Sequence, residues 1–370
     1  MKLKNRIEAT SRSRLERLRL LLLRVSADSL LVTHLPNIQY LSGFTGSAGI
    51  LLVEPSSATL FTDSRYTFQA REEVHGGGVR VQIASQGLLR AAGEHLPAHK
   101  GRTSKVGFAP AQISVAQKQA IESAAGKKLR WVQAGGLIER LRAVKDQSEI
   151  QGMRAAALLI SRVFREIAPM ISPGMAELDL AAEIDYAMRM RGASSPSFET
   201  IVASGPRSAW AHARPTSKPL RKNELVVLDQ GAILRGCCSD MTRTVFLGRA
   251  PAQIRRMYDV VLEAQRAAKD SIRPGIRAAE VDRAACQVLK RRGFGAQFTH
   301  STGHGLGIEV HEMPRLGKGD DTILEAGMVV TVEPGVYIEG LGGVRIEDDV
   351  LVTSSGAEDL TDAPREFLEL

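Results

Sequence analysis

His300-Ser-Thr-Gly-His-Gly-Leu-Gly-Ile-Glu-Val-His-Glu312 places three histidines within twelve residues. Glycines separate the histidines and would let the backbone or a ligand approach closely. The alternation of apolar residues over 306–310 predicts a strand directly after the second histidine. A cluster of this kind is rarely explained by packing alone. Imidazole combined with carboxylates makes sites for divalent Mn, Fe, Co or Zn, so the acids elsewhere in the chain decide what the cluster can bind.

Four acids stand where strongly apolar segments end or begin. Asp229 follows Leu225–Leu228, Glu333 follows Val329–Val332 and Glu347 follows Gly343–Ile346, while Asp240 opens the segment Ser239–Thr244. For any one of them, a polar residue returning to solvent is the ordinary explanation. Four such acids together with a glycine-flanked histidine predict one shared site, which would be formed by Asp229, Asp240, His304, Glu333 and Glu347.

This set of ligands is too acidic and too large for one tetrahedral zinc ion. It suits two divalent ions about 3.5–4 Å apart that share bridging carboxylates and a bridging hydroxide. Such a pair of ions activates water, so the residues predict a hydrolytic site.

At these residues the sequence resembles the pita-bread metallopeptidases. The five residues look like the five metal ligands of that family and occur in the same order. Ser239–Thr244, Gly303–Gly307 and Thr331–Gly335 are similar to the corresponding phrases of the Xaa-Pro aminopeptidase and prolidase branch. The resemblance covers nearly the whole chain.

The resemblance implies a dinuclear metal-dependent exopeptidase that releases the N-terminal residue from Xaa-Pro peptides through attack by a metal-bridging hydroxide. Asp229 would chelate one metal, His304 and Glu333 would hold the other, and Asp240 and Glu347 would bridge them. Glu333 would also relay a proton to the leaving nitrogen. Because the ligands are hard oxygens, Mn²⁺ is the first expectation, with Co²⁺ or Zn²⁺ as alternatives.

The resemblance also assigns roles to four further residues. His212 would line the substrate pocket, His311 would hydrogen-bond the substrate carbonyl and its developing oxyanion, and His300 would be a third pocket histidine. A purely structural role is the alternative for each histidine. Arg345 would support the site, or would only neutralise its neighbours Glu347 and Asp348.

Two departures from the family concern the pocket and not the metals. The family often has Asn at the position of Arg207. The loop between His311 and Glu333 is short and lacks the arginine-rich insertion by which prolidases hold the free carboxylate of a dipeptide, although Arg315 or Lys318 could substitute. These features favour an Xaa-Pro aminopeptidase acting on longer peptides, with the Xaa-Pro dipeptidase (prolidase) as the second candidate.

Three other functions fit the residues less well. Creatinase shares the fold, but its branch has lost the ligands that are present here. Methionine aminopeptidase has the five ligands but usually lacks an N-terminal domain like residues 1–145. A non-enzymatic binding protein of this fold would tolerate loss of the ligands, and all five are kept.

The sequence predicts two domains in an α/β (α+β) fold. Residues 1–145 resemble the N-terminal domain of creatinase, with an amphipathic helix over 1–24, strands over 28–32 and 50–53, and a mainly parallel or mixed sheet. Residues 146–370 contain a faint repeat, because Pro173-Gly174 recurs as Pro274-Gly275 at an offset of 101 residues. Two similar halves are what the pseudo-twofold pita-bread catalytic domain implies.

Composition limits the remaining possibilities. The net charge is +8 and the pI is about 9.5, but the basic residues alternate with acids and no nucleic-acid motif accompanies them. We therefore expect neither nucleic-acid nor membrane binding. Three cysteines, two of them adjacent, form no disulfide framework and favour the reducing cytoplasm. The partners expected are peptides with proline at the second position and, from the resemblance, a second copy in a homodimer.

Overall fold

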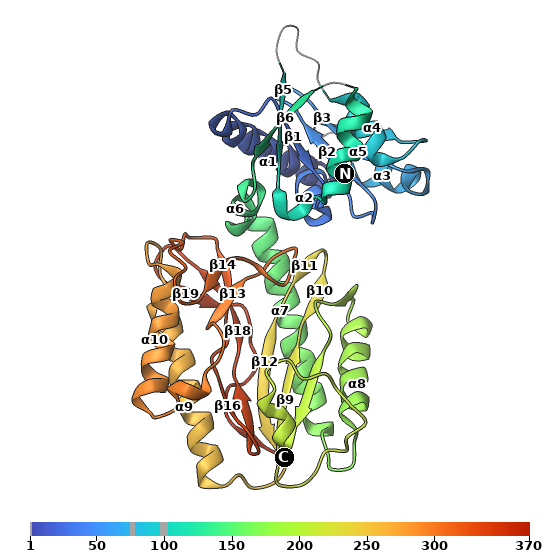
Figure 1. Ribbon diagram of the computed structural model, residues 1–370. Helices are drawn as coiled ribbons and strands as arrows, with labels where there is room; N and C mark the ends of the chain where they lie inside the picture. The colour runs from blue at the N-terminus through green and yellow to red at the C-terminus, as the bar shows by residue number, and fades with distance from the viewer. Residues whose placement is uncertain (1, 75–77, 97–102, 127) are drawn as a thin grey trace. The chain divides into compact units, whose positions relative to one another are not determined.

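The chain forms two compact units, Met1–Arg142 and Ala143–Leu370. The computed structural model describes residues 2–74, 78–96, 103–126 and 128–370, with side chains from residue 14 onward (Figure 1). The predicted domain boundary at residue 145 lies close to this division and stays a prediction.

A six-stranded mixed sheet of order β4-β3-β2-β1-β5-β6 is the centre of the first unit. Strand β2 pairs antiparallel with β1 and with β3, and the other pairs are parallel. Strands β1, β2 and β3 are buried along their whole length, so their sequences are mostly apolar and do not alternate with charged residues. The strands are β1 (Ser29–Val32), β2 (Ile50–Val53), β3 (Ala58–Thr62), β4 (Val79–Ile83), β5 (Ser104–Phe108) and β6 (Leu129–Gln133).

Six α-helices accompany this sheet in the part of the chain that the structure describes. The first is amphipathic as predicted, because Leu15, Leu18 and Leu22 are buried whereas Leu20 and Leu23 are exposed. The strands predicted over 28–32 and 50–53 and the mixed sheet are confirmed. The helices are α1 (Lys2–Val25), α2 (Leu35–Ser42), α3 (Thr67–Glu73), α4 (Leu88–His95), α5 (Val115–Ala125) and α6 (Leu137–Ala143).

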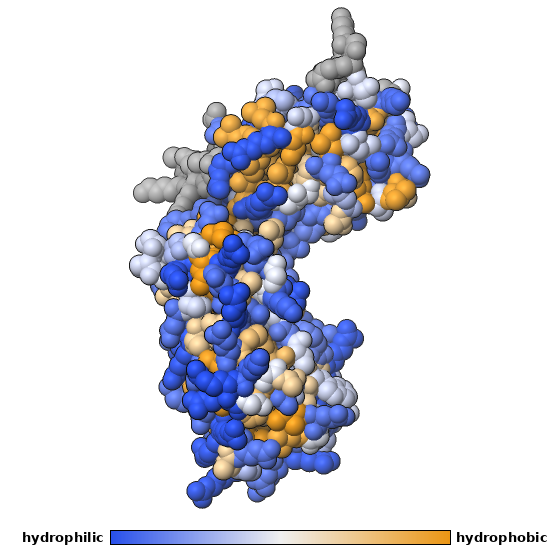
Figure 2. Space-filling model, turned by 60° about the vertical axis from the view of Figure 1, so that its left-hand side comes forward, coloured by the Kyte–Doolittle hydropathy of each residue, from blue (hydrophilic) through white to orange (hydrophobic). Residues whose placement is uncertain are grey.

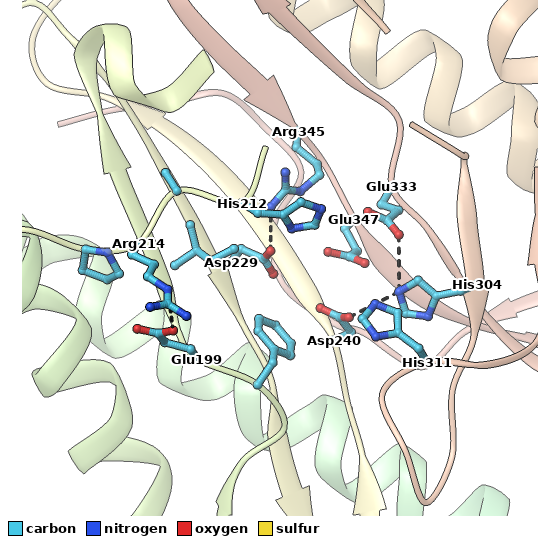
Figure 3. Close-up of a pocket in the computed structure, with 14 residues that line it drawn as sticks. Glu199, His212, Arg214, Asp229, Asp240, His304, His311, Glu333, Arg345 and Glu347 are labelled. Atoms are coloured by element: carbon cyan, nitrogen blue, oxygen red, sulfur yellow. Dashed lines mark hydrogen bonds and ion pairs between the residues drawn. The ribbon is translucent and has the colours of Figure 1, made fainter. Parts of the chain in front are cut away.

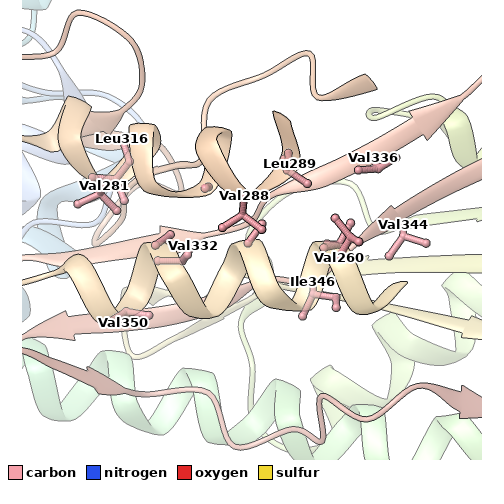
Figure 4. Packing of buried hydrophobic residues seen from close by; sticks show 14 of the residues in the cluster. Val260, Val281, Val288, Leu289, Leu316, Val332, Val336, Val344, Ile346 and Val350 are labelled. Atoms are coloured by element: carbon pink, nitrogen blue, oxygen red, sulfur yellow. The ribbon is translucent and has the colours of Figure 1, made fainter. Parts of the chain in front are cut away.

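The second unit contains two main sheets, each covered by its own pair of helices (Figure 1). Helices α7 and α8 pack on the sheet β20-β12-β9-β8, and helices α9 and α10 pack on the sheet β14-β13-β15-β18-β19. Figure 4 shows the second core, in which Val260 of α9 and Val288 of α10 lie in one cluster with Val332 and Ile346. The helices are α7 (Gln147–Ile167), α8 (Glu177–Met190), α9 (Ala252–Ser271) and α10 (Ala278–Arg291).

The strands of the second unit are mostly short. They are β7 (Ser195–Pro196), β8 (Ile201–Ser204), β9 (Leu225–Gln230), β10 (Ala232–Leu234), β11 (Cys237–Cys238), β12 (Met241–Phe246), β13 (Gly303–Gly305), β14 (Glu312–Leu316), β15 (Val329–Val332), β16 (Gly335–Ile338), β17 (Gly342–Arg345), β18 (Asp348–Val352), β19 (Ala357–Asp359) and β20 (Leu368–Glu369).

The repeat seen in the sequence corresponds to matching helices. Helices α8 and α10 each have 14 residues and begin 101 residues apart, at 177 and 278. The glycine before each helix has a left-handed backbone, with φ of 98° at Gly174 and 88° at Gly275. Glycine adopts this conformation without steric cost, which explains why both copies keep Pro-Gly at this turn.

The strand predicted over 306–310 is wrong. Strand β13 ends at Gly305, and the chain then bends until β14 begins at Glu312. The register shifts between His304 and Gly305, and the backbone N–H of Glu309 donates to the Glu312 carboxylate at 3.1 Å. These two features turn the chain although its apolar residues alternate as in a strand.

Hydrophilic residues cover most of the face shown in Figure 2, and hydrophobic residues occur there in small groups. Scattered apolar side chains are usual on globular proteins. Among the described residues, no helix combines the length and the apolar character needed to cross a membrane.

Candidate metal centre

The five predicted ligands line one cavity of about 300 Å³ in the second unit (Figure 3). The first half of the unit supplies two of them. Asp229 lies on β9 opposite Thr242 of β12, and Asp240 directly precedes β12. The other half supplies three, which are His304 on β13, Glu333 after β15 and Glu347 before β18.

His304 presents one ring nitrogen to the acids. Its Nδ1 lies 3.0 Å from the carbonyl oxygen of Gly305, which can only accept, so Nδ1 carries the proton. The unprotonated Nε2 lies 3.4 Å from Oε1 of Glu333 and 3.7 Å from Oδ2 of Asp240. A backbone carbonyl that fixes the tautomer in this way is typical of metal-binding histidines.

Three of the acids keep an oxygen atom free. Oδ2 of Asp229 accepts a hydrogen bond from Arg345, and Oε2 of Glu347 accepts one from Thr242. Oδ1 of Asp229, Oδ1 of Asp240 and Oε1 of Glu347 are buried and have no hydrogen-bond partner among the residues that the structure describes. A buried carboxylate oxygen without a partner is costly, and a cation between these atoms would remove that cost.

The distances also fit a shared ion. Asp240, His304 and Glu347 each offer one ligand atom, and these atoms lie within 4.8 Å of one another. The chemistry of the donors, four carboxylates and one imidazole, therefore fits a pair of divalent ions.

The electrostatics of the acids are strongly perturbed. Burial, followed by repulsion from neighbouring carboxylates, raises the pKa values of Asp240 and Glu347 well above their usual range. Burial raises the pKa of Glu333 to about 8 and lowers the pKa of His304 to about 4. Asp240, Glu333 and Glu347 therefore tend to retain protons in the metal-free protein, and cations would displace these protons. Perturbed carboxylates gathered in a cavity are typical of functional sites.

Arg345 connects the acids to the walls of the cavity. Its Nη2 donates to Oδ2 of Asp229 at 2.6 Å, and its Nε donates to the Thr242 hydroxyl at 2.9 Å. Its Nη1 donates to the carbonyl of Ala211 at 3.0 Å and to the Tyr337 hydroxyl at 2.8 Å. The contacts favour a supporting role over simple neutralisation of the two acids that follow it in the sequence.

A second arginine, Arg243, is only 1% exposed and contacts the backbone of the predicted ligand Glu347. Its Nη1 donates to the carbonyl of Glu347 at 2.6 Å, and its Nη2 contacts Oδ1 of Asp348 at 2.8 Å. It also donates to the carbonyls of Ala363 and Pro364 at 2.9 and 2.8 Å. Arg243 thus joins the strand that follows Asp240 to the segment that carries Glu347 and to the last part of the chain.

Two of the three predicted pocket histidines face the acids from opposite sides (Figure 3). The ring of His311 lies 4.3 Å from the ring of His304, measured between centroids. His212 lines the opposite wall, on the segment after the short helix Gly205–Ala209.

The third, His300, has both ring nitrogens occupied. Nδ1 donates to the carbonyl of Ser301 at 2.8 Å, so Nε2 accepts from the Tyr337 hydroxyl at 2.9 Å. Burial lowers the pKa of His300 to about 4, which agrees with a neutral ring. His300 can therefore offer a substrate its ring surface but no free donor or acceptor.

Sequence reasoning missed two residues of this network. Tyr337 joins His300 to Arg345, and nothing in the sequence signals a contact across 37 residues. Thr242 joins Arg345 to Glu347. The period of two residues along a strand places Thr242 on the same face as Asp240, and this signal could have found it.

A second cavity of about 310 Å³ adjoins the first and shares His212, His304, His311, Glu333 and Arg345 with it. We call its outer part the His300 lobe, which His300, Ser301 and Arg315 line. The outer part of the first cavity is the Phe198 lobe, which Phe198, Ile201 and Pro215 line. The predicted ligands thus lie between two lobes, as a scissile bond between two residues would require.

Comparisons with known proteins identify the family and the fold. Residues 151–354 match metallopeptidase family M24, and residues 14–144 match the Creatinase/Prolidase N-terminal domain. An Xaa-Pro dipeptidase of Pyrococcus horikoshii is 36% identical over 93% of this chain and 95% of its own length. The structure of an Xaa-Pro dipeptidase from Bacillus anthracis has a TM-score of 0.92 at 37% identity, covering 97% of this chain and 100% of its own. An X-Pro aminopeptidase from Thermotoga maritima has a TM-score of 0.88 at 34% identity, covering 96% and 99%.

Proposed function

Since this chain belongs to metallopeptidase family M24, we propose that it is an Xaa-Pro dipeptidase, a prolidase that hydrolyses the bond between an N-terminal residue and a C-terminal proline. The family and the two-part fold predicted from the motifs are confirmed. The dipeptidase, which was the second candidate from the sequence, is now the first.

The names of similar proteins support this change of order. Relatives and solved structures named Xaa-Pro dipeptidase match nearly the whole chain at 36–37% identity. The sequence favoured the aminopeptidase because the arginine-rich insertion is missing. That argument holds only if no other cation can bind the free carboxylate of a dipeptide.

Arg315 is the observation that carries the proposal. It is exposed, lies on β14 opposite His304, and lines the His300 lobe. Its guanidinium interacts electrostatically with Asp320 but makes no hydrogen bond or ion pair among the described residues, so it can bind an anion. Lys318, the other cation considered, does not line either cavity. In a dipeptide the carboxylate belongs to the proline itself, and Arg315 would bind it in the lobe that receives the proline ring.

Asp229, Asp240, His304, Glu333 and Glu347 are the residues that would hold two divalent ions. Two bound divalent ions would supply a water nucleophile at neutral pH and polarise the scissile carbonyl. Mn²⁺ is the expected ion because most of the ligands are carboxylates. A homodimer and a cytoplasmic location are further expectations.

The chain's own groups have separate tasks in this proposal. His311 and His212 hydrogen-bond the carbonyl oxygen and its developing charge from opposite walls. Glu333 passes a proton to the proline nitrogen as the bond breaks. The ring surface of His300 packs against the proline. An Xaa-Pro bond has no N–H, and none of these contacts needs one.

The aminopeptidase is the second candidate, because the solved Thermotoga maritima enzyme of that name is 34% identical over 96% of this chain. The two activities differ in whether the proline carboxylate is free. A tripeptide replaces that charge with a neutral amide and further chain.

The test uses Mn²⁺-loaded protein with Leu-Pro, Leu-Pro amide and Leu-Pro-Gly. We expect Leu-Pro to have the highest kcat/KM. Arg315→Gln should raise KM for Leu-Pro about tenfold or more, the value of one charge-assisted hydrogen bond, and should change hydrolysis of the amide little. Lys318→Gln is the matched control and should behave like the wild type. Preference for Leu-Pro-Gly, unchanged by Arg315→Gln, would make the protein an aminopeptidase.

A further inference from the structure

The segment 210–216 carries His212 and lines the first cavity without regular secondary structure. Its backbone makes turn hydrogen bonds from Trp210 and Ala213, and only at its end, where the Thr216 carbonyl accepts from Leu178 of α8 at 3.0 Å, is it tied to another element. Other contacts must therefore hold His212 in place.

Arg207 makes three contacts to this segment and its support. Its Nη2 donates to the carbonyl of Arg214 at 2.5 Å, and its guanidinium carbon lies 4.9 Å from the centre of the Trp210 ring. Its Nε donates to Oε2 of Glu177 at 3.2 Å. One planar side chain thus contacts the segment on both sides of His212 and ties it to a helix.

Groups other than Arg207 hold the Glu177 carboxylate in place. It is fully buried at the first residue of α8. Its carboxylate also accepts from the backbone N–H and hydroxyl of Ser204 at 2.9 and 2.8 Å, and from those of Thr216 at 3.1 and 2.8 Å. Four donors and a helix N-terminus already stabilise the charge. Neutralising Glu177 is therefore a weak explanation for Arg207.

The segment has a second support on its other side. Arg345, which binds Asp229, also donates to the carbonyl of Ala211 at 3.0 Å. His212 thus lies between a residue tied to the metal ligands and a residue tied to α8.

From these contacts we infer that Arg207 is a positioning residue, which holds the segment 210–216 so that His212 faces the acids. Its effect on catalysis rests on the proposed function, in which His212 contacts the substrate carbonyl. Without Arg207 the segment would have to be ordered when the substrate binds, and that entropy cost raises KM more than it lowers kcat.

The experiment compares Arg207→Gln and Arg207→Lys in Mn²⁺-loaded protein. Arg292→Gln is the matched control, because Arg292 also donates its Nε to a glutamate, Glu263, at 2.9 Å, and it does not line either cavity. The Gln variant should lose about five- to tenfold in kcat/KM for Leu-Pro, mostly through KM. The Lys variant should recover part of this loss, since Lys keeps the charge but cannot contact Glu177 and the Arg214 carbonyl together.

A spectroscopic readout accompanies the kinetics. Trp131 and Trp210 are the two tryptophans of the chain, so Trp131→Phe leaves Trp210 as the single reporter. In that background Arg207→Gln should make Trp210 more accessible to acrylamide quenching, while Arg292→Gln should not.

Two results would overturn the inference. One is a Gln variant whose KM and Trp210 quenching match the wild type. The other is a loss of activity that only follows the fraction of unfolded protein, with Trp210 unchanged in the folded fraction. If the wild type cleaves no Xaa-Pro peptide, the proposed function fails, and Trp210 quenching still decides whether Arg207 holds the segment.

Discussion

Nη2 of Arg345 lies 2.6 Å from Oδ2 of Asp229, and this contact leaves Oδ1 of Asp229 buried without a partner. The arginine therefore orients a carboxylate whose second oxygen is free for a cation. A residue behind a ligand in this way controls both the position and the charge of the ligand.

Arg345→Lys should reduce metal affinity or kcat/KM by about 10- to 100-fold, the usual cost of losing a group that orients a metal ligand. Lysine keeps the positive charge but cannot contact Asp229, Thr242 and Tyr337 at once. Titration calorimetry with Mn²⁺ and steady-state kinetics on Leu-Pro would measure the two effects. Wild-type values for both would show that the geometry of Arg345 is unimportant.

Asp240→Asn should abolish most of the activity and lower the metal content of the purified protein below about two ions per chain. The asparagine amide is neutral, and its nitrogen atom does not bind a metal ion as the carboxylate oxygen would. Elemental analysis after dialysis against Mn²⁺ gives the stoichiometry, and chelator-treated wild type gives the metal-free reference. Full hydrolysis by the chelated protein would contradict the metal assignment.

Tyr337→Phe should lower kcat/KM for Leu-Pro about fivefold, the value of roughly 1 kcal/mol for one hydrogen bond, and leave metal content unchanged. The hydroxyl joins His300 to Arg345, so its loss frees the His300 ring and removes one of the partners of Arg345. Equal losses of metal and activity would instead indicate that Tyr337 acts through Asp229.

The stability of the metal-free protein should fall as pH rises from 6.5 to 8. The pKa of Glu333 is about 8 in the folded protein against an ordinary value of 4.5, so the folded state holds a proton that the unfolded chain releases. The contribution of Glu333 to the stability of the folded protein is fully present below pH 4.5 and is lost as the pH rises toward 8. His300 and His304 make stability rise with pH instead, because their pKa values are lowered from 6.5 to about 4. Their effect is confined to pH values below 6.5.

Thermal unfolding of the chelated protein at pH 6.5 and pH 8 measures this effect, and the midpoint should be lower by about 2 °C or more at pH 8. Added Mn²⁺ should remove the difference, because cations replace the protons. Glu333→Gln cannot titrate and should show a smaller difference. A metal-free midpoint that rises over this range would contradict the raised pKa values.

The buried pair of Lys145 and Glu312 should show strong coupling. Nζ of Lys145 lies 3.3 Å from Oε2 of Glu312, and the side chains are 2% and 6% exposed. Lys145→Met alone should cost about 3–5 kcal/mol, because it removes a buried cation from beside a buried carboxylate. Adding Glu312→Gln should recover much of this loss, since glutamine can still accept from the N–H of Glu309. Urea unfolding of the four proteins gives the coupling energy, and additive losses would exclude a direct interaction.

The parts of the site that the sequence predicts are those that follow strand ends. Asp229, Glu333 and Glu347 each close an apolar run, and strands of adjacent sheets bring such ends together. The offset of 101 residues likewise predicts matching helices, because glycine at a left-handed turn marks each start. A feature that repeats with a fixed residue period, or that requires a particular backbone conformation, can be recognised from the sequence alone.

Contacts between distant side chains leave no such pattern. Lys145 and Glu312 are 167 residues apart, and nothing near either one indicates the other. In the sequence, Arg207 is only a departure from the residue that the family often has. Its contacts with Glu177 and the Arg214 carbonyl are seen only in the structure. The failed strand over 306–310 has the same origin, since a carboxylate contact overrides local alternation.

The contacts of Arg243 bear on the order in which the chain is synthesised, folds and binds metal. Its guanidinium is satisfied partly by the carbonyls of Ala363 and Pro364, and β20 (Leu368–Glu369) pairs with the strand that carries it. These residues are synthesised after all five predicted ligands. A nascent chain would therefore carry every ligand before Ala363, Pro364 and β20 can complete the contacts of Arg243, and stable metal loading should wait for that segment.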